Sequence, residues 1–87
     1  MLSREKIEIY KRCNGDGDAW AMSSRGKEKS LIDDSDWSLI DNFIQDIKLI
    51  KNGLAADSYA KDVQQRLKTH CDNEQIIEEL YKLTEKY

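Results

Sequence analysis

The stretch SDWSLIDNFIQDIKLIKNG, residues 35–53, decides the fold because its apolar side chains recur at the three- and four-residue spacing of an α-helix. Four of them share one stripe and three more widen it: Trp37, Ile40, Ile44 and Ile47, then Leu39, Phe43 and Ile50. A stripe this wide is typical of a helix that contacts neighbours on more than one side. We therefore expect a central helix of about 17 residues, about 25 Å long.

The ends of this helix are marked by polar residues and a glycine. Asp34 or Ser35 is the expected N-cap, and Asp36 in the first turn suits the positive end of the helix dipole. At the other end, Gly53 can adopt the left-handed conformation that closes a helix.

Similar signals predict three further main helices, over residues 3–13, over residues 57–70, and from residue 72 or 73 towards the C-terminus. Ser3 is the expected cap of the first helix, and Asp72 or Asn73 is the expected cap of the last. The side chains expected on the inner faces are Ile7, Tyr10 and Cys13; Ala60, Val63 and Leu67; and Ile76, Ile77, Leu80 and Leu83, with Tyr87 extending the last stripe. A short additional helix is predicted over residues 18–24.

No stretch sustains the period-two alternation of a β-strand, and connections of a few residues favour antiparallel packing of consecutive helices. The sequence thus predicts an all-α fold. We expect a small single-domain helical bundle over residues 1–87, with four main helices, one short helix and short connections.

The composition of the chain narrows the range of functions to be considered. The 87 residues hold 14 basic and 17 acidic side chains, a net charge of −3, which argues against the broad cationic surface that non-specific nucleic-acid binding requires. No window approaches the roughly 20 apolar residues of a membrane span, and the first residues lack the apolar run of a signal peptide. We therefore expect a cytoplasmic protein without membrane contact, in which Cys13 and Cys71 are reduced.

The stretch NGDGDAW, residues 14–20, begins like a calcium-binding loop. An EF-hand needs Gly at position 6 and a bidentate Glu at position 12, and counting from Asn14 these positions hold Ala19 and Arg25. Counting from Asp16 instead places Trp20 where an oxygen ligand is required. We interpret the stretch as a corner between two helices.

A zinc site or a catalytic thiol would have to use Cys13, His70 and Cys71. Tetrahedral zinc takes four ligands, and adjacent residues such as His70 and Cys71 diverge on a helix. A Cys–His pair also needs a third group that orients the base. The sequence therefore predicts no metal, no cofactor and no enzyme activity.

The remaining interpretation is a small acidic protein that acts through protein–protein contacts, as an inhibitor, a neutralising protein or an adaptor. The first choice of contact surface is an acidic stretch that could meet a basic partner: Asp33, Asp34, Asp36 and Asp41. Tyr59, Tyr81 and Tyr87 lie near the edges of their stripes, and a second copy of the chain is a further candidate partner.

The alternative is a nucleic-acid or phosphate-binding accessory protein that uses the basic loop at residues 25–29. Three cations and an aromatic residue near them would carry this activity and are the second choice of contact surface: Arg25, Lys27, Lys29 and Trp20. Against this alternative, Glu28 interrupts the cations and five aspartates follow them in residues 31–46.

Overall fold

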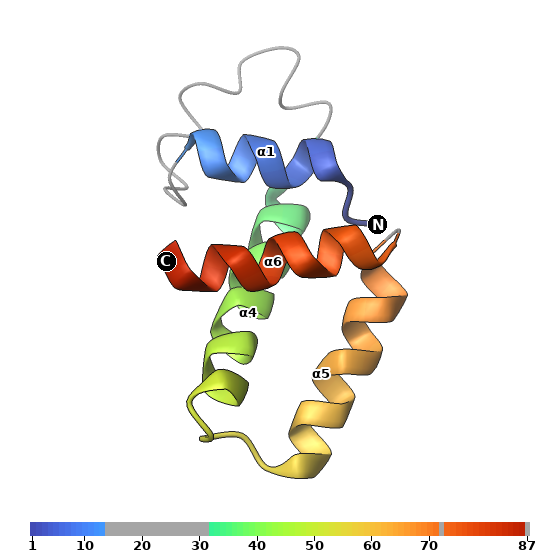
Figure 1. Cartoon of the computed structure of the whole chain (residues 1–87). Coiled ribbons are helices and arrows are strands. Elements are labelled where there is room, and N and C mark those ends of the chain that lie inside the picture. Colours follow the sequence, from blue (N-terminus) through green and yellow to red (C-terminus); the bar gives the residue numbers. More distant parts are fainter. Residues whose placement is uncertain (14–31, 72, 87) are drawn as a thin grey trace.

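Four helices form the computed structural model of the chain, which describes residues 1–13, 32–71 and 73–86 (Figure 1). They are α1 (Arg4–Arg12), α4 (Asp34–Lys51), α5 (Asp57–His70) and α6 (Glu74–Lys86). The expected all-α fold with four main helices is confirmed. The short helix expected at residues 18–24 and the corner at residues 14–20 lie outside the described residues.

The central position expected for α4 is also confirmed, because α4 contacts each of the other three helices and packs most extensively against α6. Its buried side chains are Trp37, Ile40, Phe43, Ile44 and Ile47. Leu39 and Ile50, which widen the stripe, are partly buried and pack against the same core. The chain's own helices therefore account for the width of this stripe.

The helices are arranged in two directions (Figure 1). α4 and α5 run in opposite directions, joined by residues 52–56, as expected for consecutive helices. α6 departs from that expectation, because the chain turns at Cys71 and α6 then lies across α4, beside α1. Cys71 has extended backbone angles (φ −108°, ψ 136°), and its neighbour His70 accepts a hydrogen bond from the Leu2 amide at 2.6 Å.

The N-terminal residues hold this turn in place. Leu2 forms an isolated parallel β-bridge with Cys71, and the Leu2 side chain is 0% exposed. Leu2 was not expected in the core, nor were Ile9 and Ile32, which are buried too. The residues expected on the inner faces of α1, α5 and α6 are buried except for Ala60 and Ile77, which are partly buried, and Tyr87, which lies outside the described residues.

Polar side chains cap three of the helices. The Ser3 hydroxyl accepts from the Lys6 amide at 3.5 Å, as expected. Asp33 caps α4 by accepting from the Asp36 amide at 2.9 Å, so the expectation of Asp34 or Ser35 was wrong. In α6 the cap is Asn73, whose side chain accepts from two amides of the first turn.

Gly53 ends α4 with φ +70°, the left-handed conformation predicted for it. Its amide donates to Ile50 at 3.1 Å and the Leu54 amide donates to Leu49 at 2.9 Å, the two bonds of a Schellman motif. A contact between the apolar residues at these two outer positions commonly accompanies this motif. Leu49 and Leu54 hold these two outer positions, and both are exposed.

None of the helices in the described ranges is long and apolar enough to cross a membrane.

Candidate partner-binding surface

The first-choice acidic residues lie in the N-terminal half of α4, which we call the acidic end: Asp33, Asp34, Asp36 and Asp41. Asp33 is the N-cap, and Asp34 and Asp36 stand in the first turn. The positive end of the helix dipole stabilises carboxylates at these positions. Local helix energetics therefore explain part of the acidity, and the remaining question is which carboxylates face solvent.

Two of the four carboxylates bind α1. Lys6 lies 3.1 Å from Asp36 in an ion pair whose side chains are each 19% exposed. The Tyr10 hydroxyl donates to Asp41 at 2.5 Å. These contacts attach α1 to α4, so Asp36 and Asp41 have a structural role within the domain.

Trp37 completes this attachment. Its ring lies 4.6 Å from the Tyr10 ring, centroid to centroid, and the side chain is buried. A pair of aromatic rings at this distance adds roughly 0.5–1.5 kcal/mol beyond the burial of area. Trp37 is therefore a core residue, and it fixes the helix turn that carries the acidic end.

Asp33 and Asp34 are the exposed members of the acidic end. The solvent-facing side of α4 continues from them with small or uncharged polar residues: Ser35, Ser38, Asn42 and Gln45. No basic residue interrupts this face before Lys48 in the last turns of α4. The structure thus presents two carboxylates at the start of a polar, uncharged helix face.

The second-choice residues Trp20, Arg25, Lys27 and Lys29 lie outside the described residues. Their use in nucleic-acid or phosphate binding stays a prediction.

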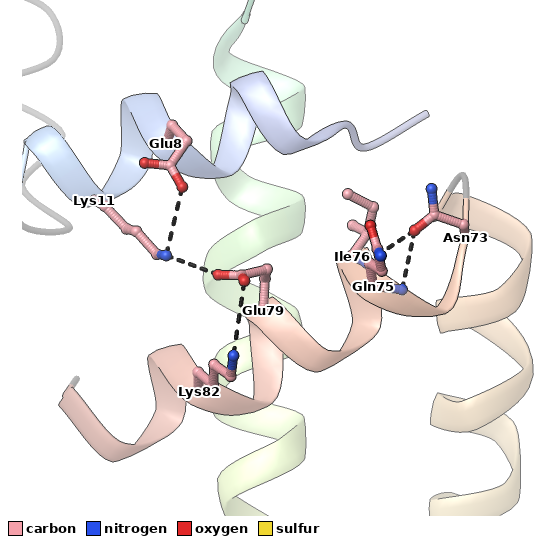
Figure 2. A network of polar contacts seen from close by, with 7 residues as sticks. All are labelled: Glu8, Lys11, Asn73, Gln75, Ile76, Glu79 and Lys82. Atoms are coloured by element: carbon pink, nitrogen blue, oxygen red, sulfur yellow. Dashed lines mark hydrogen bonds and ion pairs between the residues drawn. The ribbon is translucent and has the colours of Figure 1, made fainter.

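An ion-pair network that the sequence did not reveal joins α1 to α6 (Figure 2). Lys11 of α1 donates to Glu79 of α6 at 2.7 Å. Glu8 lies 3.5 Å from Lys11, and Lys82 lies 4.0 Å from Glu79. The hydrogen bond to Glu79 raises the pKa of Lys11, and the same bond lowers the pKa of Glu79. The partners are 68 residues apart, so no local spacing signals the pair.

A second network joins α4 to α5. The Tyr59 hydroxyl donates to Asp46, and Arg66 lies 3.2 Å from both Asp46 and Asp62. The hydrogen bond to Asp46 raises the pKa of Tyr59. Tyr59, expected as an exposed contact residue, is thus tied to its own domain although it is 38% exposed. Tyr81 is partly buried against the core, and Tyr87 lies outside the described residues.

The residues considered for metal or thiol chemistry lie in structural positions. Cys13 caps the C-terminus of α1, and Cys71 is buried at the α5–α6 turn. His70 is partly buried, with its ring 6.1 Å from that of Phe43. Within residues 1–13, 32–71 and 73–86, no three His, Cys, Asp or Glu side chains gather closely enough to hold a metal ion.

Comparisons of the chain with protein-family models, with curated proteins and with solved structures found no match. Fold and surface define a small all-α domain, and its function is inferred from its own residues.

Proposed function

We propose that this chain is a non-enzymatic protein-binding domain that docks through the acidic end of α4 onto a basic surface of another protein. An inhibitor, a neutralising protein and an adaptor all work in this way. The observation that carries the proposal is the exposure of Asp33 and Asp34 at the start of a helix that is held by the core on its opposite side.

Rigid presentation supports this role. Asp33 and Asp34 precede Trp37 by about one helical turn, and that side chain is buried against Tyr10. The contacts of Asp36 and Asp41 with α1 hold the same turns. A surface held in this way loses little conformational freedom when a partner binds, which favours affinity.

The chemistry of the exposed face supports a protein partner of basic character. Carboxylates at the rim of an interface mainly speed the encounter with a positive surface. Serine, asparagine and glutamine beside them can both donate and accept hydrogen bonds. The short serine side chains also leave room for the partner to approach the helix closely.

Among the described residues, the displaced pKa values belong to contacts within the domain. The groups with displaced pKa values, Lys11, Glu79 and Tyr59, owe the displacement chiefly to a hydrogen bond with a surface partner. Such pairs are common in structural ion-pair networks, whereas catalytic acids and bases are usually displaced by burial in a cleft.

The test is paired affinity capture from the native cell. The bait variant Asp33→Asn/Asp34→Asn removes two negative charges and keeps the α4 cap, because asparagine caps as well as aspartate. The matched control is Glu5→Gln/Asp57→Asn, which removes two first-turn charges from α1 and α5. We expect a protein that wild type and control retain and the bait variant loses. Identical captured proteins for all three baits would refute the acidic end as the docking surface.

A further inference from the structure

The corner between α5 and α6 contains a groove with an apolar floor. It is lined by Gln64, Leu67 and Lys68 of α5 and by Ile77 and Tyr81 of α6, and its volume is about 120 Å³. Leu67 is buried, whereas Ile77 and Tyr81 are only partly buried and pack at the edge of the core. Part of their apolar surface therefore remains in contact with solvent.

The two walls of this groove carry opposite charges. On α5, Lys61 and Lys68 are exposed and seven residues apart, so they share one side of the helix with Gln64. Asp57 begins the same side at the far end of α5, so the wall is basic in the part that lies near the corner. On α6, Glu74 precedes Ile77 by three residues and Glu78 precedes Tyr81 by three, so both exposed carboxylates neighbour a residue of the groove along the helix. Glu78 also lines the hollow between α1 and α6. None of these four lysine and glutamate charges has an oppositely charged group within ion-pair distance among the described residues.

A basic wall opposite an acidic wall is complementary to a second copy of itself. Figure 1 shows that α5 ends and α6 begins at the same corner, near Cys71. A two-fold axis that is parallel to the bisector of this corner, and displaced outward from the plane of the two helices, lays α5 of each copy over α6 of the other. Lys68 stands in the last turn of α5 and Glu74 in the first turn of α6, so both lie near the corner and the axis brings each close to the other in the second copy.

We propose that two copies of the chain associate through the α5–α6 groove. Lys68 of each copy faces Glu74 and Glu78 of the other, and the partly exposed faces of Ile77 and Tyr81 are buried between them. The contact is isologous, because every pairing occurs twice. It is closed, so association stops at the dimer.

This association uses a different surface from the proposed docking site. The acidic end belongs to α4, and none of its four aspartates lines the groove. A dimer would therefore present two acidic ends at once, and a partner with two basic sites would bind it with higher avidity than a monomer.

The test measures the dimer dissociation constant of the full chain by sedimentation equilibrium, for charge variants of the two walls. Lys68→Glu and Glu78→Lys each place like charges opposite one another twice per dimer. We expect each single change to weaken the dimer about tenfold or more. The combined variant Lys68→Glu/Glu78→Lys exchanges the two signs, and we expect it to recover most of the wild-type affinity.

Glu5→Lys is the matched control, since it makes the same charge change as Glu78→Lys on an exposed position of α1. Far-ultraviolet circular dichroism checks that each variant keeps its helices. A wild-type chain that remains monomeric at millimolar concentration would refute the proposal. Single variants that dimerise as well as the Glu5→Lys control would also refute it, as would a combined variant that stays as weak as the singles. The Asp33→Asn/Asp34→Asn variant should dimerise normally, so this test and the capture test can fail separately.

Discussion

The second residue of the chain should matter as much as a residue of the central helix. Chain ends usually tolerate change, but Leu2 is 0% exposed and its amide is bonded to His70. Truncation to Leu2→Ala removes the buried branched end of the side chain. Such truncations cost roughly 2–5 kcal/mol in protein cores, and we expect about 3 kcal/mol here.

In a domain of this size each kcal/mol lowers the melting temperature by roughly 4–8 °C, so Leu2→Ala should melt about 15 °C below wild type. Thermal unfolding followed by circular dichroism measures this shift. Leu54→Ala is the matched control, since it makes the same chemical change at a side chain that is 73% exposed. It should cost less than about 0.5 kcal/mol. Leu2→Met, which conserves volume, should cost less than about 1.5 kcal/mol. If the Leu2→Ala variant melted at the same temperature as the Leu54→Ala variant, the packing of the N-terminal residues against the core would be refuted.

Three further changes test other contacts of the fold. Gly53→Ala should destabilise the domain by about 1 kcal/mol in urea unfolding, because φ at this residue is +70°. Gly53→Asn should cost less, and equal costs for the two variants would contradict the left-handed conformation at the end of α4. The Lys11–Glu79 pair should contribute about 0.5–1 kcal/mol between pH 5 and 10. The lowered pKa of Glu79 means that this contribution begins to be lost as pH falls below about 4.5, and the raised pKa of Lys11 means that it begins to be lost as pH rises above about 10.5. The stability gap between wild type and Lys11→Met should therefore narrow towards both extremes, and a gap that does not narrow as pH falls below about 4.5 would contradict the pair. Tyr10→Phe and Asp41→Ala should show a coupling energy of about 1 kcal/mol in a double-mutant cycle, whereas additive effects would contradict their hydrogen bond.

The elements themselves were predictable because their signals are local. Trp37, Ile40, Ile44 and Ile47 recur at helical spacing, and a stripe of that width predicted the central place that α4 occupies. Gly53 was predictable for the same reason, since the left-handed conformation is costly for other residues. Caps were harder, because Asp33, Asp34 and Ser35 are all good capping residues and only the extended backbone of Asp33 selects it.

The direction of α6 was not predictable from local spacing. It depends on the bridge between Leu2 and Cys71, which are 69 residues apart in the sequence. The short α5–α6 connection favoured an antiparallel pair of helices. In the structure Leu2 pairs with Cys71 at this connection, and α6 lies across α4 instead. The Lys11–Glu79 pair escaped prediction for the same reason.

Part of the candidate surface could be predicted from the sequence. Asp36 falls on the same stripe as Ile40, Phe43 and Ile47, at spacings of four, seven and eleven residues, which is a signal that its carboxylate turns towards a neighbouring helix. Asp41 lies between Trp37 and Ile44 in the same way. Helical spacing therefore marks these two as structural carboxylates. It does not mark Asp33 as exposed, because Asp33 stands at the same spacings from Trp37, Ile40 and Ile44; Asp33 is exposed as the extended N-cap residue that precedes the helix.

The most direct test of the proposed function is the association rate of the captured partner with the wild-type chain and with the Asp33→Asn/Asp34→Asn variant, at low and high salt. If the acidic end meets a basic surface, the variant should associate several-fold more slowly at low salt, with a weaker salt dependence and a similar dissociation rate. Equal association rates for wild type and variant at low salt would contradict docking through the acidic end of α4.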